Sequence, residues 1–259
     1  MKQWNGLLMK DWTRVKTTVL VTLVLSFLLL FFFPVLFHKT FLSSVNLFDV
    51  MLVFNAFISV IYMLFSSVIL VILLEKDMKR PDIWLYSTAS AWKLVGAKFF
   101  LACLIGLAIQ LLPFIAISVS YLFMTATIPF KEFAAVGAFG VVMAFLSAST
   151  TACFNLLAWV IYRLLRNKVG RLAIPVVLIL IISFYWLFGW FITTDLYTEY
   201  FQIGAIPHSY FDNEVIQIQF FEAKPNEPVF YAGDMLFSLF MTIAPYMLAI
   251  VLFDKKVRY

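Results

Sequence analysis

The chain has 259 residues, of which 64% are hydrophobic and only 13% are charged, and its mean hydropathy is +0.98. This composition excludes an ordinary soluble domain, which cannot cover so much apolar surface, and favours a protein that faces lipid. The formal net charge of +5 comes from basic residues that flank the apolar stretches, so it gives no reason to expect nucleic acid as a partner.

Six apolar stretches are each long enough to cross a bilayer, which takes about 20 residues in a helix. None holds Lys, Arg, Asp or Glu away from its ends. The sequence therefore predicts an all-α polytopic membrane protein that forms a single transmembrane domain over residues 1–259. The predicted spans are residues 17–37, 51–74, 99–123, 136–160, 172–192 and 235–253.

The segment before the first span, residues 1–16, places Trp4, Leu8 and Trp12 on roughly one helical face. Its basic residues can reach lipid headgroups. This pattern predicts an amphipathic elbow helix that lies in the membrane interface. The alternative is a disordered basic tail.

Two of the spans carry a stripe of small and polar residues at helical spacing. Such stripes let membrane helices approach closely and form hydrogen bonds with one another. Helix packing explains them, and so does a position on a translocation path or at a subunit interface. The stripe in 51–74 consists of Asn55, Ser59, Tyr62 and Ser66, and the stripe in 136–160 consists of Gly140, Ala144, Ser147, Thr151 and Asn155.

The connection between the second and third spans holds five basic residues, three acidic residues and two tryptophans within residues 73–98. Pro81 followed by Asp82 predicts the start of a helix. Trp84, Leu85 and Thr88 would share one face of that helix. It either anchors the connection in the membrane interface or docks onto a cytoplasmic partner.

Residues 193–234 form the longest connection on the opposite side of the membrane. The alternation in EVIQIQFF predicts a strand, with EAKPNEP as the turn that follows it. A small hairpin and a pair of short interfacial helices are both compatible with the sequence of this segment.

The basic residues are distributed unevenly between the two sides. Sixteen of the 19 Lys and Arg residues fall on the side of the N-terminus, the 75–98 connection, the 161–171 connection and the tail. Because basic residues accumulate in cytoplasmic connections, both termini are predicted to be cytoplasmic and residues 193–234 extracellular.

Motifs for catalysis and ATP binding are absent from the sequence. It has no Walker A loop, no HExxH motif and no ionisable residue inside a predicted span. His38 and His208 are isolated from other metal ligands, and Cys103 and Cys153 lie inside predicted spans as packing residues. We therefore expect neither a catalytic site nor a metal site, and neither an enzyme nor a self-powered carrier.

The order of these parts resembles the permease subunits of bacterial ABC transporters of the type-2 permease class. The family pattern between spans 2 and 3 has a Glu and basic residues, then a Leu-rich helix ending in Ser-Thr-Pro, then a basic-apolar run into Gly-x-Lys. The run 93–98 matches the end of this pattern, whereas Ala89 replaces the usual Pro and 80–82 replaces a common Ser-Gly-Thr. The residues that match its start and middle are Glu75, Lys79, Arg80, Trp84, Leu85, Ser87 and Thr88.

The resemblance implies that residues 79–97 are a cytoplasmic coupling helix against an ATPase. It also implies separate ATP-binding cassette subunits that carry ATP and Mg, no cofactor in this chain, and a second permease subunit as a homo- or heterodimer in the lipids of a bacterial cytoplasmic membrane. The expected activity is export of a hydrophobic or amphipathic substrate, such as a peptide, a lipid-like molecule or a drug. The alternative is a membrane sensor or immunity protein that binds an amphipathic antimicrobial without pumping it. The expected ATPase-coupling residues are Glu75, Lys79, Arg80, Asp82, Trp84, Leu85, Ser87 and Thr88.

Overall fold

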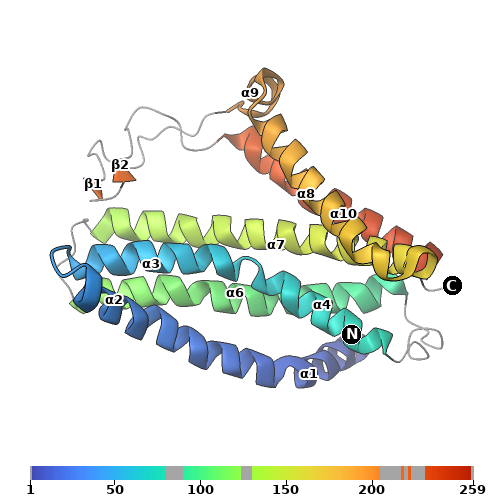
Figure 1. Ribbon diagram of the computed structural model, residues 1–259, viewed down its shortest axis with the longest axis horizontal. Coiled ribbons are helices and arrows are strands. Elements are labelled where there is room, and N and C mark those ends of the chain that lie inside the picture. The colour runs from blue at the N-terminus through green and yellow to red at the C-terminus, as the bar shows by residue number, and fades with distance from the viewer. Residues whose placement is uncertain are drawn as a thin grey trace.

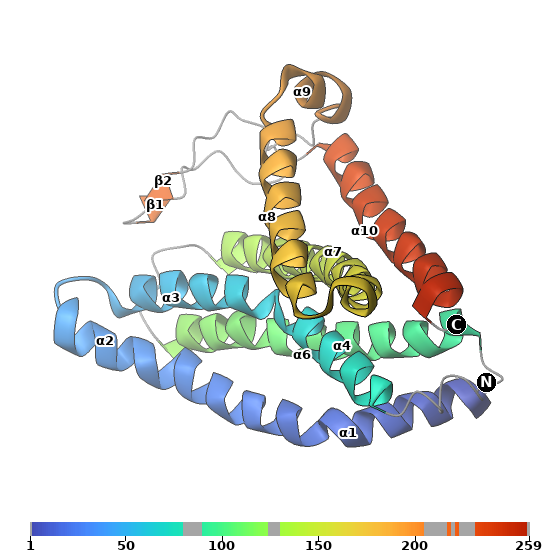
Figure 2. The same cartoon turned by 45° about the vertical axis from the view of Figure 1, so that its right-hand side comes forward.

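The computed structural model describes residues 2–79, 90–123, 130–204, 217–218, 221–222 and 231–257. Its helical elements form an elongated bundle with two further helices that diverge from it (Figures 1 and 2). Five helical stretches are long and apolar enough to cross a membrane, which agrees with the predicted class of polytopic helical membrane protein. These stretches are Trp4–Phe41, Leu47–Met78, Ala91–Phe123, Gly140–Ile192 and Ala232–Lys255.

The N-terminal stretch is one unbroken helical run. It comprises α1 (Lys2–Phe27), the π-helical turn η1 (Leu28–Phe32) and α2 (Phe33–Phe41). The boundary that we predicted between an elbow and a first span, at residue 16, is not a break in the helix. The sequence from residue 10 to residue 33 contains no Gly or Pro that would interrupt it. The widened turn precedes Pro34, which has no amide hydrogen and whose ring crowds the carbonyl of residue 30.

The second stretch consists of α3 (Leu47–Tyr62) and α4 (Phe65–Met78), separated by a short turn at residues 63–64. Helix α3 begins where the sequence supplies an N-cap, because the Asn46 side chain accepts a hydrogen bond from the Phe48 amide at 3.0 Å. The helix pair is longer at both ends than the predicted span 51–74.

Two long helices, α6 (Ala91–Phe123) and α7 (Phe130–Val169), complete the bundle with α1, α3 and α4. Gly170 ends α7 in the left-handed conformation, with φ at 61°, which only glycine adopts readily. The short 3-10 turn η2 (Gly170–Leu172) then leads into α8 (Ala173–Ile192). Together, α7, η2 and α8 thus cover both of the spans predicted at 136–160 and 172–192.

Helices α8 and α10 (Ala232–Leu252) diverge from α7 towards α9 (Asp195–Phe201), whereas the π-helical turn η4 (Phe253–Val257) follows α10 at its other end (Figure 2). Aromatic rings hold α8, α9 and α10 together, with Tyr197 and Phe237 at the centre. Tyr197 donates a hydrogen bond to Asp234 Oδ1 at 2.7 Å. Burial and this carboxylate raise the pKa of Tyr197 to about 12, so its hydroxyl remains a donor at neutral pH.

The long connection contains both of the elements that the sequence left open, a short helix and a strand pair. Besides α9, strands β1 (Gln217–Ile218) and β2 (Phe221–Glu222) pair antiparallel, with Gln217 opposite Glu222. The pair forms within EVIQIQFF and its next residue. Strand β2 therefore includes the first residue of the stretch EAKPNEP, which we had predicted to be a turn.

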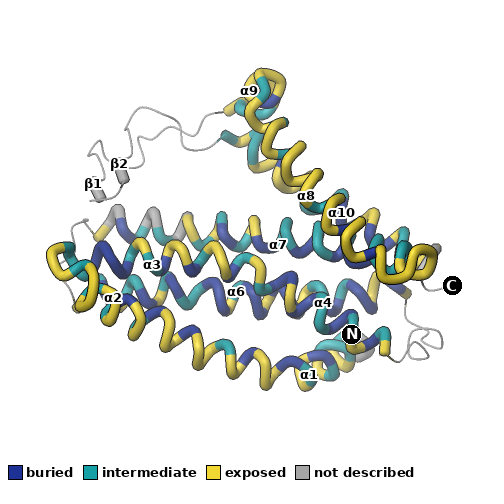
Figure 3. Tube along the Cα trace, in the orientation of Figure 1, coloured by how far each residue is buried: buried dark blue, intermediate teal, exposed yellow. Residues whose placement is uncertain are grey.

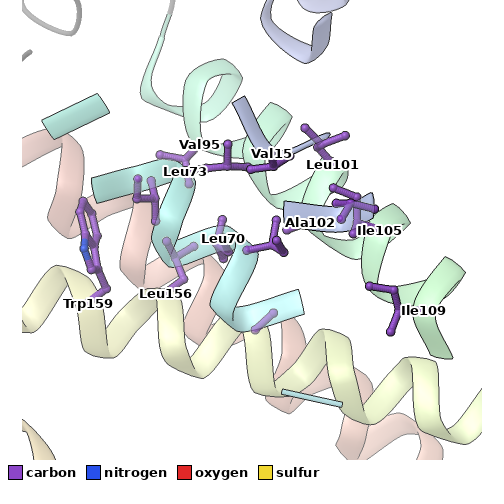
Figure 4. Packing of buried hydrophobic residues seen from close by; sticks show 14 of the residues in the cluster. Val15, Leu70, Leu73, Val95, Leu101, Ala102, Ile105, Ile109, Leu156 and Trp159 are labelled. Atoms are coloured by element: carbon purple, nitrogen blue, oxygen red, sulfur yellow. The ribbon is translucent and has the colours of Figure 1, made fainter. Parts of the chain in front are cut away.

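The buried core lies where α1, α4, α6 and α7 meet. Figure 4 shows Val15, Leu73, Val95 and Leu156, one from each of these helices, converging on this region. All four are at most 1% exposed. The outward faces of α1 and α8 are largely exposed and apolar (Figure 3), as expected for helices that face lipid or another subunit.

One end of the bundle holds both chain termini, the end of α4 at Met78 and the start of α6 at Ala91 (Figures 1 and 2). We call it the proximal end. The opposite, distal end holds the connection between α2 and α3. Residues 80–89, which contain most of the predicted coupling helix, lie outside the described residues.

Candidate functional site

Two groups of polar residues stand out inside the bundle. The first surrounds a cavity of about 410 Å³ between α3, α6 and α7, which we call the polar cavity. Asn55 and Ser59 of the first predicted stripe line it. The second stripe faces it from α7 through Gly140, Ala144 and Ser147. The sequence predicted the two stripes separately, and the structure places part of each stripe on the lining of one cavity.

Gln110 of α6 also lines the polar cavity and was missed by the sequence analysis. Its side-chain amide donates to the hydroxyl of Ser59 and to the Ser59 carbonyl at 3.3 Å. The Asn55 amide donates to the Met51 carbonyl at 2.7 Å. The signal that could have revealed Gln110 is that it is a lone carboxamide in an otherwise apolar stretch, where such a group requires a partner.

Both carboxamides are almost completely buried, with Asn55 0% and Gln110 3% exposed. Asn55 Oδ1 and Gln110 Oε1 nevertheless have no hydrogen-bond partner among the described residues. Buried polar atoms are normally paired in folded proteins. Residues that line the cavity therefore carry two acceptor oxygens without a partner.

The other members of the two stripes lie away from the polar cavity. Tyr62 donates to Ser26 Oγ of α1 at 2.6 Å. Ser66 packs against Gly106, where a Cβ would lie 3.0 Å from Ser66 Cβ. Thr151 and Asn155 line two separate hollows beside α8. Tyr62 and Ser66 therefore each contact a neighbouring helix of this chain.

The second group is a charged cluster at the proximal end of the bundle. Lys98 Nζ lies 2.7 Å from Asp11 Oδ2 and 2.7 Å from Asp77 Oδ2. These three residues are at most 2% exposed and come from α6, α1 and α4. Arg14 contacts Asp77, and Lys10 Nζ lies 3.6 Å from Asp77 Oδ1. The cluster thus joins three helices through charges that are almost fully removed from solvent.

The charged cluster was not predicted from the sequence. Asp77 and Lys98 fall just outside the predicted spans, where charges are ordinary, and Asp11 fell in the predicted interfacial segment. Each ion is costly to bury alone, and the mutual pairing offsets that cost. The cluster therefore fixes the positions of α1, α4 and α6 relative to one another.

A third polar contact connects α4 to α7 beside the charged cluster. Trp159 Nε1 donates to Glu75 Oε1 at 2.7 Å, and Arg163 donates to Glu75 Oε2. The Arg163 guanidinium also lies over the Trp159 ring, 5.3 Å from its centroid. Glu75 was predicted to couple to an ATPase, and the structure places it against α7.

Of the remaining predicted coupling residues, Lys79 lies in the described part of the chain and the others do not. The Lys79 amide bonds to the Glu75 carbonyl at 3.3 Å and terminates α4. Residues 91–97, which we assigned to the coupling helix, belong to α6, and Val95 is 1% exposed within the core. The coupling role of residues 79–97 stays a prediction. Arg80, Asp82, Trp84, Leu85, Ser87 and Thr88 lie outside the described residues.

Among the residues that the structure describes, no group of three or more His, Cys, Asp or Glu is placed to hold a metal ion. Cys103 and Cys153 are both free thiols buried between helices. No family model, curated protein or solved structure matches this chain. Its function is therefore inferred from the polar cavity, the charged cluster and the sequence pattern.

Proposed function

We propose that this chain is the membrane-spanning permease subunit of an ATP-driven ABC transporter. It would have six spans, both termini in the cytoplasm and no ATPase activity of its own. The substrate would be hydrophobic or amphipathic and would be exported. The unbroken helix from Lys2 to Phe41 would place its first turns at the cytoplasmic membrane surface, in the role of the elbow.

The observation that carries the proposal is the position of the charged cluster. Residues 80–89, with the motif that resembles a coupling helix, connect α4 directly to α6. Asp77 lies next to the end of α4 and Lys98 lies two turns into α6, and they bind each other. A partner that pushes on residues 80–89 would therefore move both helices as one unit.

Two further contacts would transmit that displacement through the bundle. Asp11 attaches α1 to the same lysine, and the contact of Glu75 with Arg163 attaches α7. Packed elements held by specific contacts pass on such motion more effectively than isolated helices do. The polar cavity lies between α3, α6 and α7, so it would change shape when α6 and α7 move.

A second permease subunit is part of the proposal. The exposed side chains of α8, and those of α1 from Leu20 onward, are mostly apolar, and Figure 3 shows these faces as exposed. Lipid can cover such faces, and so can a second copy or a related chain. A dimer would enclose a path wider than the polar cavity of one chain.

Affinity purification from native membranes tests the proposal. The tagged chain should retain an ATPase that contains a Walker A motif, identified by mass spectrometry, and the pair should hydrolyse ATP. Trp84→Ala should reduce ATPase recovery about 30-fold or more, because truncating a central interface aromatic costs roughly 2–4 kcal/mol. Tyr200→Ala is the control, since this aromatic side chain is 62% exposed on α9, outside the faces of α1 and α8 that a second subunit would cover.

The alternative function is a membrane sensor or immunity protein. The polar cavity supports this alternative, because a cavity can bind an amphiphile without any ATPase. Purification without an ATPase, together with normal behaviour of the Trp84→Ala variant, would support this alternative and overturn the transporter proposal.

A further inference from the structure

The polar cavity exists partly because α7 presents a glycine to it. A Cβ built on Gly140 would meet no heavy atom within 4 Å. Asn55 and Ser59 of α3 and Gln110 of α6 also line the cavity. At about 410 Å³, the space falls within the range of small-molecule sites, which is about 300–1,000 Å³.

The hydrogen bonds within the cavity wall determine which hydrogen-bonding groups remain for a ligand. The amide of Asn55 is held by the Met51 carbonyl, and the amide of Gln110 is held by Ser59. Both side-chain oxygens are therefore left without a partner. The wall offers two acceptor oxygens without a partner, beside the second amide hydrogen of Asn55, for which no acceptor is seen among the described residues, so a ligand that satisfies the two oxygens must donate hydrogen bonds.

The charge of the ligand is limited by the rest of the lining. None of the described residues that line the cavity is Asp, Glu, Lys, Arg or His. Phe114, Phe133 and Met143 supply apolar surface for a hydrocarbon or aromatic body. A fully charged ligand group would be buried without a counter-ion, which is strongly unfavourable.

We propose that the polar cavity binds a small neutral amphiphile whose one or two O–H or N–H groups donate to Asn55 Oδ1 and Gln110 Oε1. If the chain is the proposed permease, this ligand is its transported substrate, and that statement rests on the proposed function. The binding step itself does not need an ATPase. It is therefore measured on the purified chain alone.

The test uses two photoreactive probes in lipid nanodiscs, a diazirine-bearing 4-alkylphenol and its methyl ether. The two have the same apolar body and differ in one donor. The phenol should label α3, α6 and α7 saturably, and the ether should bind about three- to tenfold more weakly, the worth of one hydrogen bond. Equal binding of the two probes, or labelling confined to the exposed face of α8, would overturn the proposal.

Variants identify the groups responsible. Asn55→Leu combined with Gln110→Leu should bring the affinities of phenol and ether together. Gly140→Leu should block both probes, because its side chain enters the open space. Thr242→Val is the control: it removes a polar contact with Thr150 at 2.6 Å, outside the polar cavity, and should leave binding unchanged. Size-exclusion profiles establish that each variant is folded.

The outcomes separate the two proposals. Selective phenol binding in a chain that retains no ATPase would uphold the cavity as a binding site and overturn the transporter. Retention of an ATPase with no difference between the probes would leave the transporter standing and overturn the assignment of the cavity. Undiminished labelling in the Gly140→Leu variant would likewise overturn that assignment.

Discussion

Lys98 of α6 and Asp11 of α1 form an ion pair at 2.7 Å although 87 positions separate them in the chain. Lys98 holds Asp77 at the same distance. One cation thus pairs with two carboxylates from two other helices, and Arg14 and Lys10 bring further positive charge to Asp77. The three groups are almost completely buried, so water cannot solvate a charge that loses its partner.

Replacing Lys98 with Met should destabilise the folded chain strongly. The change removes the one buried cation that pairs with both carboxylates and leaves only the partly exposed Arg14 and Lys10 near them. Breaking a buried pair in this way costs about 3–5 kcal/mol. Thermal unfolding in detergent, followed by fluorescence-detected size exclusion, measures the loss.

Lys93→Met is the matched control for this prediction. Lys93 is exposed on the same helix, so its replacement should leave the unfolding temperature unchanged. Adding Asp11→Asn to Lys98→Met removes one of the stranded charges and should recover part of the loss. Equal melting of the Lys98→Met and Lys93→Met variants would show that the cluster contributes nothing to stability.

Replacing Arg163 with Ala should destabilise the chain by less, about 1 kcal/mol. Its partner Glu75 has a side chain that is 37% exposed, and water screens partly exposed pairs. Arg166→Ala is the control, because Arg166 is exposed one helical turn away. The same unfolding assay ranks the variants, and a loss from Arg163→Ala as large as that from Lys98→Met would contradict the screening argument.

Topology gives a prediction that does not depend on the partner. In a background where Cys103 and Cys153 are replaced by Ala, cysteine at Glu199 should react with a membrane-impermeant thiol reagent on intact cells. Cysteine at Asn167 should react only after permeabilisation. Both positions are exposed in the structure, so burial does not explain a difference. The reverse pattern would invert the orientation inferred from the basic residues.

The apolar helices were predictable from the sequence because hydropathy is a local property. The run from residue 99 to residue 123 shows its span directly, and the structure extends it into α6. The stripe at Asn55 and Ser59 was visible because helical spacing is also local. Which other helix the stripe faces depends on packing between distant segments, so the sequence did not pair it with Gly140.

The charged cluster could not be predicted for the same reason. Asp77 and Lys98 lie at span ends, where charges commonly meet headgroups and water, and no local pattern marks them as mutual partners. The predicted elbow shows the limit of a local pattern. Its amphipathic pattern was visible because helical spacing is local, and Trp4 does lie beside Phe100 of α6. The helix nevertheless continues past residue 16, because amphipathicity alone does not say where a helix ends.

The close approach of α4 and α6 gives a final prediction based on two glycines. A Cβ on Gly106 would lie 3.0 Å from Ser66 Cβ, closer still to its hydroxyl and 3.5 Å from its Cα. Gly106→Ala should therefore force the two helices apart and destabilise the chain by about 1–3 kcal/mol, the usual cost of overpacking. The unfolding temperature in detergent again reports the effect.

Gly140→Ala is the matched control, since the added methyl group enters open space and alanine favours helix more than glycine does. It should be neutral or slightly stabilising. The double variant Gly106→Ala with Ser66→Gly removes the side chain that causes the clash and should recover much of the lost stability. If Gly106→Ala melts like Gly140→Ala, α4 and α6 do not pack as closely as their contact at Ser66 requires.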